Sequence, residues 1–272
     1  MKTIIVATDF SPAAWNAACY AADMAKAIGT QVVLLHVYTL PVSYGEMPIA
    51  FNPDQMLQDI QEEMSKLKQQ LTERTAGKVT IEVVVKMGNF YTELEVLCER
   101  LRPYVVILGS QGTTAAERLL LGGHTVFVMR HLEWPLITVP PERTFTGIKK
   151  IGLACDFSHV SETVPVKLLQ QFADDFHAEL HILNVEAKRD ATPAMVHESD
   201  RLHEMLAPMA PHYHYSVHAD ANESLMEDAE LLQLDLLVVL PKHHDLLHRL
   251  THKSHTRNLT MHCPVPLMAL QP

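Results

Sequence analysis

The sequence repeats itself, and this repeat constrains the fold more than any other feature. The segment Val-Ala-Thr-Asp-Phe-Ser at residues 6–11 returns as Leu-Ala-Cys-Asp-Phe-Ser at residues 153–158. Four more blocks return in the same order and pair residues 32–37 with 180–185, 105–108 with 237–240, 118–125 with 249–256, and 134–136 with 265–267. Chance supplies one such match but hardly five in order, so we interpret the chain as a tandem duplication.

The seam of the duplication lies in a polar, proline-containing stretch. Residues 140–147 read Pro-Pro-Glu-Arg-Thr-Phe-Thr-Gly. A chain of 272 residues is long enough for two domains of ordinary size. The sequence therefore predicts one domain at residues 1–141 and a second at residues 146–272.

Each half alternates short apolar runs with segments of helical periodicity. In the first half we expect strands at residues 3–7, 31–37, 78–86, 104–108 and 136–139, and helices at 12–28, 54–74, 91–102 and up to about 131. The second half repeats this order with a shorter middle helix at 195–206. The alternation predicts an α/β fold in which each domain has a five-stranded, mainly parallel sheet with helices on both faces. Ligands of such sheets bind at the carboxyl ends of the strands.

Composition excludes several classes of protein. With 47% hydrophobic and 20% charged residues the chain has the balance of a globular protein, and its net charge of −10 argues against nucleic-acid binding. No apolar run approaches the length of a membrane span, and Asp9 ends the N-terminal apolar run too early for a signal peptide. The four cysteines are widely scattered, which excludes a disulfide framework and a zinc ribbon and makes the cytoplasm the expected location.

A glycine pattern follows the fourth predicted strand of the first half. It reads Gly109-Ser110-Gln111-Gly112, then nine residues, then Gly122-Gly123-His124-Thr125, where a helix is expected to begin. Glycines let a backbone approach a ligand closely, and the first amides of a helix are unpaired donors at its positive end. The pattern therefore predicts an anion site, and phosphates are the common cellular anions that would occupy it.

Asp9, His36-Val37 and the Gly-x2-Gly-x9-Gly pattern together resemble the universal stress protein family. The resemblance covers both halves and implies a tandem protein of two flavodoxin-like, Rossmann-like domains of the adenine nucleotide alpha hydrolase-like type. In the nucleotide-binding branch of the family, the aspartate helps to hold adenosine, the end of the second strand lies near the base, and the glycine segment binds phosphates. Carried over to this chain, the resemblance implies an ATP or other phosphate-bearing ligand at Ala7, Thr8, Asp9, Val37, Gly109, Ser110, Gly112, Gly122, Gly123, His124 and Thr125.

The match in the first half is imperfect. The hydroxyl residue that closes the family's pattern falls on Gly123, which keeps a backbone amide and loses a side-chain contact. His124 stands where an aliphatic residue is usual and either contacts a phosphate or obstructs it, while Thr125 is the nearest replacement for the missing hydroxyl.

The second half departs further from the pattern. Its glycine positions align with Pro241, His244 and Lys253, and only Ser254 keeps the closing hydroxyl. Proline has no amide to donate and the other two side chains would crowd a phosphate, so we expect this half to have lost nucleotide binding.

Histidines accumulate where those glycines are missing. Fourteen of the 17 histidines follow residue 145. A zinc or other transition-metal site is one hypothesis for them, and its candidate ligands are Cys155, Asp156, His243, His244, His248 and His252. The alternative is that they are solvated loop histidines. A separate run, which contains His212, His214 and His218, is interpreted as the polar edge of a strand.

The sequence leaves three classes of function open. The favoured interpretation is a stress-response or regulatory protein with a small-ligand site in its first domain. The alternatives are a binding or scaffold protein for a nucleotide-sugar or lipid precursor, and a metal-dependent enzyme working from the second half. No catalytic motif is present and no catalytic group can be named, so we expect slow ATP hydrolysis at most. Asp9 and Asp156 also have a simpler interpretation as caps of the helices that follow them.

The last strand of each half is expected to join the two domains. In the universal stress protein family such domains often pair through their final edge strands, and the corresponding segments here are residues 136–139 and 266–270. Their pairing would give an intramolecular pseudo-dimer and would cover two edges that otherwise invite aggregation. The sequence leaves open whether two chains associate further.

Overall fold

A computed structural model describes residues 2–40, 52–110, 125–186, 193–241 and 259–271 of the chain. The first half contributes strands and helices in the predicted alternation: β1 (Thr3–Ala7), α1 (Pro12–Ile28), β2 (Gln31–Tyr38), α2 (Pro53–Arg74), β3 (Ile81–Met87), α3 (Phe90–Leu101), β4 (Val105–Gly109) and β5 (Leu136–Val139). A helical segment at 125–131 precedes β5.

The second half repeats this order with one change. Its elements are β6 (Lys150–Ala154), α5 (Val160–Thr163), α6 (Val166–Phe176), β7 (Glu179–Glu186), α7 (Pro193–Leu206), a 3-10 turn (Ala207–Met209), β8 (His212–Val217), α8 (Ala221–Leu231), β9 (Leu236–Val239) and β10 (Leu267–Ala269), with a helical segment at 259–262. Where the first half has one helix of 17 residues after its first strand, the second half has the short α5 and then α6. Pro165 lies between them, and proline cannot continue a helix.

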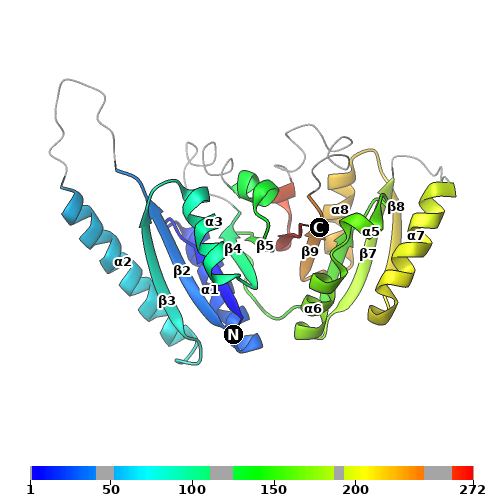
Figure 1. Ribbon diagram of the computed structural model, residues 1–272. Coiled ribbons are helices and arrows are strands. Elements are labelled where there is room, and N and C mark those ends of the chain that lie inside the picture. The colour runs from blue at the N-terminus through cyan, green and yellow to red at the C-terminus, as the bar shows by residue number, and fades with distance from the viewer. Residues whose placement is uncertain (1, 41–51, 111–124, 187–192, 242–258, 272) are drawn as a thin grey trace, which may run out of the picture.

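All ten strands form one sheet in the order β3-β2-β1-β4-β5-β10-β9-β6-β7-β8. The two halves thus supply the same strand order in opposite directions from the centre (Figure 1). Pairing is parallel within each half, and the halves join through antiparallel β5 and β10, where Ile137 lies opposite Met268. This confirms the predicted contact between the two final strands.

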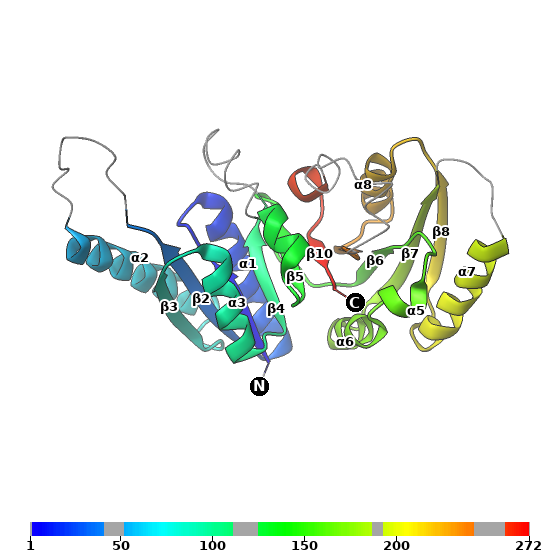
Figure 2. The same ribbon diagram turned by 45° about the horizontal axis from the view of Figure 1, so that its top comes forward.

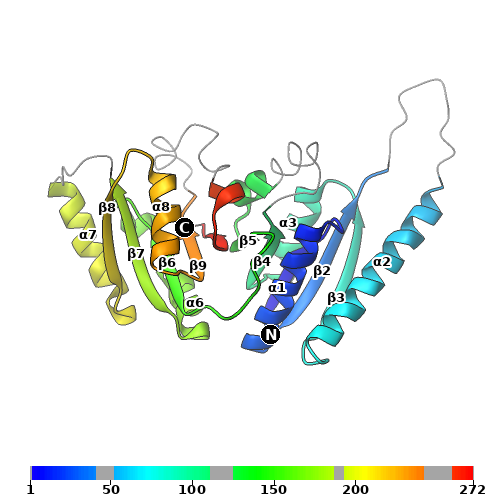
Figure 3. The ribbon, with the colours of Figure 1, turned by 180° about the vertical axis from the view of Figure 1, so that it is seen from behind.

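Helices cover both faces of the sheet, as the continuous apolar strands predict. One core lies between the sheet and the face that carries α1, α2, α6 and α7, and the other lies under α3, α8 and the segments 125–131 and 259–262. Figures 2 and 3 show that each half has helices on both sides of its strands. The N-terminal strand also reaches the second half, because Lys2 forms an ion pair with Asp175 of α6 and lies over the Tyr104 ring.

Local sequence signals explain where α1 begins and ends. Ser11 caps its N-terminus by accepting a hydrogen bond from Ala14 N at 3.1 Å, and Pro12 occupies the first turn, where a missing N–H costs nothing. Gly29 closes the helix in the left-handed conformation with φ 64°. These signals place the start of α1 directly after the carboxyl end of β1, which is where the ligand crevice of such a sheet is expected.

Candidate functional site

The strand order of the first half contains one reversal of direction, and it lies between β1 and β4. From β1 the chain moves outward to β2 and β3, then crosses back to place β4 on the other side of β1. The connections on either side of a reversal leave in opposite directions, so a crevice opens outside the carboxyl ends of those two strands. The candidate site is therefore set by topology at the ends of β1 and β4.

Six of the predicted site residues meet this edge of the sheet. They lie at or just beyond the carboxyl ends of β1 and β4 or close to the end of β2, namely Ala7, Thr8, Asp9, Val37, Gly109 and Ser110. Thr125 is half-buried at the start of the helical segment 125–131. The predicted residues Gly112, Gly122, Gly123 and His124 lie outside the described residues.

Asp9 belongs to a tight turn, which we name the β1–α1 corner (residues 7–14). Its Oδ1 accepts a hydrogen bond from Ser11 N at 2.9 Å, and the Thr8 hydroxyl accepts one from Phe10 N at 3.0 Å. The turn places Phe10 in the left-handed region with φ 63°. A carboxylate offers about four acceptor positions, so this one bond leaves Asp9 able to accept more. The N-cap of α1 is Ser11, so the interpretation of Asp9 as the helix cap is wrong; its carboxylate shapes the turn before the helix and is free for a second role.

His36 supports the corner from β2. Its Nδ1 donates to the Thr8 carbonyl at 2.7 Å, and its ring lies against that of Phe10 with centroids 4.5 Å apart. Burial lowers the pKa of His36, although the Thr8 carbonyl and the Asp9 charge act in the opposite direction. The imidazole is therefore neutral near pH 7, with its proton on Nδ1. His36 is thus a hydrogen-bonded packing residue of the corner.

Phe10 is a member of this corner that sequence reasoning missed. Its side chain is 37% exposed although it follows a buried strand. An aromatic ring held in place by a histidine at the mouth of a crevice offers a flat apolar surface. The available signal was an aromatic residue directly after the aspartate in both halves of the chain.

Comparisons with known proteins agree with this arrangement. The sequence model of the Universal stress protein family matches residues 1–140. The chain belongs to this family. A universal stress protein from Archaeoglobus fulgidus has a similar fold, with a TM-score of 0.72 and 16% identity over 99% of this chain and 96% of that one.

Two further solved structures resemble the whole chain. A putative universal stress protein from Pseudomonas aeruginosa gives a TM-score of 0.61 at 12% identity, covering 100% of this chain and 94% of its own. The cytoplasmic domain of a prokaryotic cation chloride cotransporter gives a TM-score of 0.53 at 11% identity, covering 98% and 94%. At such identities the likeness shows the α/β fold alone. No curated protein sequence matches the chain significantly.

Gly109 allows a close approach of helix to strand in this universal stress protein. A Cβ atom at this position would lie 2.9 Å from both the backbone carbon and the carbonyl oxygen of Ala13, which is closer than real Cβ contacts. The first turn of α1 can lie directly on the end of β4 only because this residue has no side chain. Gly109, predicted as part of a phosphate cradle, thus also has a packing role.

The sheet register corrects the predicted alignment of the two halves. Ile4 lies opposite Val105 in the first half, and its counterpart Ile151 lies opposite Leu236, so the sequence match that paired Val105 with Leu237 was wrong by one residue. Gly109 therefore corresponds to Leu240, and Pro241 takes the place of Ser110. A short apolar run matches almost equally well when it is shifted by one residue, which is why sequence alone misplaced it.

The corresponding turn of the second half, the β6–α5 corner (residues 154–161), keeps the same hydrogen bonds. Asp156 Oδ1 accepts from Ser158 N at 3.0 Å, and Asn184 donates to the Cys155 carbonyl at 2.9 Å, as His36 does to Thr8. The surroundings differ, because Phe157 is only 4% exposed. Glu198 of α7 also accepts a hydrogen bond from Val160 N at 2.8 Å, so the chain's own carboxylate caps α5.

The zinc hypothesis gains no support from the described part of the chain. Among those residues no group of three or more His, Cys, Asp and Glu side chains could hold a metal ion. Cys155 is buried and Asp156 is half-buried at the end of β6. The other candidate ligands, His243, His244, His248 and His252, lie outside the described residues, and so do Lys253 and Ser254 of the predicted glycine alignment. Zinc therefore stays a prediction from sequence.

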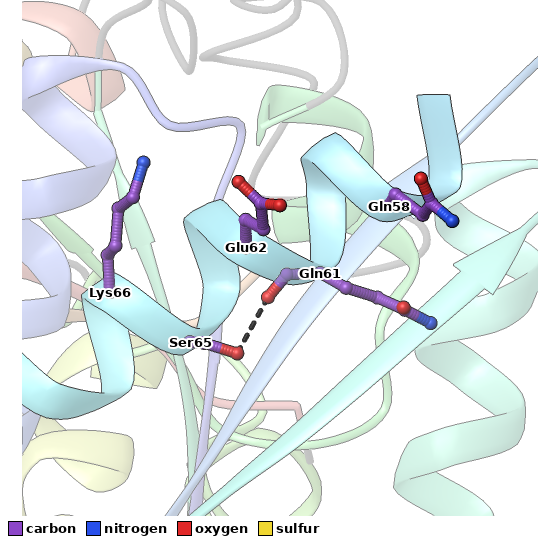
Figure 4. Close-up of a pocket in the computed structure, with 5 residues that line it drawn as sticks. All are labelled: Gln58, Gln61, Glu62, Ser65 and Lys66. Atoms are coloured by element: carbon purple, nitrogen blue, oxygen red, sulfur yellow. Dashed lines mark hydrogen bonds between the residues drawn. The ribbon is translucent and has the colours of Figure 1, made fainter. Parts of the chain in front are cut away.

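Two other features of the described residues bear on function. A hollow of about 420 Å³ lies on the outer side of α2, away from the strand ends, and its lining comes from that helix alone: Gln58, Gln61, Glu62, Ser65 and Lys66 (Figure 4). Polar groups of one exposed helix do not converge on a ligand. Within the described ranges, no helix is both long enough and apolar enough to span a membrane.

Proposed function

We propose that this universal stress protein binds an adenine nucleotide, ATP in the first instance, in the first of two domains at residues 1–141 and 146–272. The observation that carries the proposal is the position of Asp9 and Gly109 at the carboxyl ends of β1 and β4, on either side of the reversal in strand order. A carboxylate suits ribose hydroxyls, and the glycine segment that begins at Gly109 suits phosphates.

Different residues of the proposed site suit different parts of the nucleotide. The exposed Phe10 ring, held by His36, and Val37 near the end of β2 form the side suited to a base. Ser110 and Thr125 begin and end the segment suited to phosphates, with Gly112, Gly122, Gly123 and His124 between them in sequence. Asp9 lies between these parts at the end of β1, where it suits the ribose.

The second domain lacks three features of this site. Leu240 replaces the glycine at the strand end, Phe157 is buried, and Glu198 occupies the first amide of α5. Each change removes space or a free donor that a bound phosphate would need. We therefore propose that the second domain is a structural partner without nucleotide, and that the protein acts in stress response or its regulation. The four cysteines are free and buried, which suits the reducing cytoplasm.

Calorimetry with Mg-ATP on the full chain tests the proposal through matched substitutions. Asparagine can replace aspartate in both turns, because its amide oxygen can still accept from Ser11 or Ser158. We expect Asp9→Asn to weaken ATP binding by about tenfold or more, since hydrogen bonds to a charged group contribute about 1.5–3 kcal/mol. Asp156→Asn should leave ATP affinity unchanged.

The outcomes separate the two parts of the proposal. A wild-type protein that fails to bind ATP at millimolar concentration overturns the nucleotide site itself, and mass spectrometry of small molecules released from the purified protein then decides among other ligands. Wild-type affinity in Asp9→Asn would leave the nucleotide site in place and remove Asp9 from it. An equal loss in Asp156→Asn would contradict the assignment of the site to the first domain.

A further inference from the structure

Three histidines gather on one face of β7 and β8, far along the sheet from the proposed nucleotide site. His181 of β7 lies directly opposite His212 of β8 in the sheet register, and His214 lies opposite the next residue on that face, Leu183. The ring planes of His212 and His214 are tilted by 29° and 25° from that of His181, with centroid distances of 5.1 Å and 5.2 Å. His181 is 7% exposed, so the centre of this cluster is buried.

The hydrogen bond at the centre of the cluster limits how many protons it can hold. His181 Nδ1 lies 2.9 Å from His214 Nε2, so one of these nitrogens must donate and the other accept. One added proton can be shared across this bond, because a protonated imidazole still donates to a neutral one. With both rings protonated, two N–H groups face each other and the bond is lost.

The other nitrogen of His181 faces one carboxylate but has no hydrogen bond among the described residues that would stabilise a charge. His181 Nε2 is buried and finds no hydrogen-bond partner among the described residues, and Glu179 Oε2, 3.7 Å away, is too distant for a hydrogen bond. An imidazolium at this position would therefore bury an N–H that water cannot reach, next to two other imidazoles that repel it when charged.

Charged groups from each neighbouring element face the cluster. Lys150 of β6 acts against a charge on His181 and Glu179 of β7 acts in its favour, but burial and then the two neighbouring histidines lower the pKa of His181. Burial likewise lowers the pKa of His214, against the effect of Asp228 of α8. Asp228 is in turn held by a hydrogen bond from Ser216 of β8 at 2.9 Å. The folded cluster thus favours neutral rings.

The histidine cluster lies on the pairing between β7 and the outer strand β8, so it affects how stably β8 is held on the sheet. Among the described strands, β8 is the last of the sheet and has β7 as its single partner. An outer strand with a single partner belongs to the least stable part of a sheet. Interactions between opposed side chains hold such a pair together in addition to its backbone hydrogen bonds. On this face the opposed pairs are His181–His212, Leu183–His214 and Val185–Ser216, so a histidine takes part in two of the three.

We propose that β8 is an acid-sensitive outer strand, which the hydrogen-bonded His181–His214 pair holds on β7 near neutral pH and which a second proton on that pair releases. The released strand would expose the edge of β7, together with the half-buried Tyr213 from the opposite face of β8. Such a device links acidification to the conformation of the second domain without requiring a nucleotide in the first.

The direction of the pH effect follows from the shifts. Both histidines have folded-state pKa values below the ordinary value, so the unfolded strand binds more protons in acid than the folded strand does. The stabilising contribution is complete above about pH 6.5, the unfolded value for histidine, and is lost as the pH falls below it. Because two protons are needed, the loss should be steeper than a single titration.

Amide hydrogen exchange on the full chain tests the proposal with an internal control. β3 occupies the same place at the other end of the sheet and contains no histidine. Between about pH 7.5 and about pH 5.0, we expect protection factors of the β8 amides to fall about tenfold or more, while those of β3 stay level. An equal change in both strands would overturn the proposal.

Two substitutions assign the effect to the cluster. His214→Gln keeps an amide group that can donate to or accept from His181 but cannot titrate, so the loss of β8 protection in acid should shrink to about threefold or less. His203→Gln is the matched control, because His203 of α7 lies beside Tyr213, which points to the opposite face of β8. The proposal is wrong if the first variant retains the full acid response, or if the second removes it. Should His214→Gln not fold, the comparison of β8 with β3 in the wild type still decides.

Discussion

The β1–α1 corner and the β6–α5 corner share a hydrogen-bond skeleton but differ in what they present to solvent. In each, an aspartate accepts from the backbone of a serine two residues later, and a side chain from the neighbouring strand donates to the carbonyl before the aspartate. Each also places a phenylalanine at positive φ, 63° in one and 53° in the other. Yet Phe10 is 37% exposed and Phe157 only 4%.

The difference begins at the neighbouring strand end. Gly109 allows α1 to lie against β4, whereas Leu240 fills the corresponding place in the second half. There the single helix is replaced by α5 and α6, and Glu198 caps the short α5 from α7. The comparison teaches that the turn itself is a structural feature of the fold, while the residue at the end of the adjacent strand decides how closely the following helix can lie on it.

The largest expected effect comes from adding a side chain at Gly109. Gly109→Ala places a Cβ against the backbone of Ala13, which cannot move without moving α1, and we expect a loss of about 3 kcal/mol in the free energy of unfolding. Urea denaturation of the full chain measures this loss.

Gly152 of β6 provides a matched control inside a strand. An added Cβ there would lie 2.4 Å from Leu234 Cδ1, nominally a worse clash, but that atom is the end of a side chain that can adopt another rotamer. Gly152→Ala should therefore cost about 1 kcal/mol. If the two variants lose equal stability, or the order is reversed, the packing role of Gly109 is refuted.

Sequence predicted the fold of the described residues closely because several signals agreed. The repeat gave the two halves, apolar runs gave the strands, and Ser11, Pro12 and Gly29 fixed the ends of α1. The division of the second-half helix into α5 and α6 was missed. Pro165 marks this division in the sequence. The carboxylate that caps α5 comes from α7, 38 residues further along the chain, and no local pattern encodes such a partner.

The candidate site was predictable only in part, for a similar reason. Asp9 and Gly109 follow apolar strands and could be placed from local order. The exposure of Phe10 and the contact of Gly109 with Ala13 depend on how helices cross the sheet, which a sequence does not show. The alignment of the second half failed by one residue because only strand pairing fixes a register.

The next prediction asks whether the two corner hydrogen bonds are interchangeable. His36→Asn gives the first corner the residue of the second, and an asparagine amide can donate to the Thr8 carbonyl as Asn184 does to Cys155. We expect it to cost less than about 1 kcal/mol, whereas His36→Leu leaves that carbonyl without its donor and should cost about 2 kcal/mol. Thermal and urea unfolding compare the two.

The stability difference between the wild type and His36→Asn should also depend on pH. Burial lowers the pKa of His36, so its contribution to stability is complete above about pH 6.5 and declines as the pH falls below that value. His36→Asn should lack this decline, and the difference in unfolding free energy between wild type and variant should narrow in acid. A difference that is independent of pH would mean that His36 does not titrate in this range.

The smallest expected effect concerns the carboxylate that closes the second corner. Glu198→Ala leaves Val160 N without its acceptor, and loss of such a helix cap costs about 1 kcal/mol. Glu198→Gln keeps an oxygen acceptor without the charge and should lose about half as much. Glu204→Ala is the control, because Glu204 is an exposed residue of the same helix and its removal should change stability by less than about 0.5 kcal/mol. If Glu198→Ala and Glu204→Ala are equal, the cap contributes nothing and Leu240 alone explains the closed corner. If Glu198→Ala is the more destabilising, the Glu198 carboxylate takes the place that a ligand's anionic group would have at the N-terminus of α5. That helix end is then stable without a bound ligand.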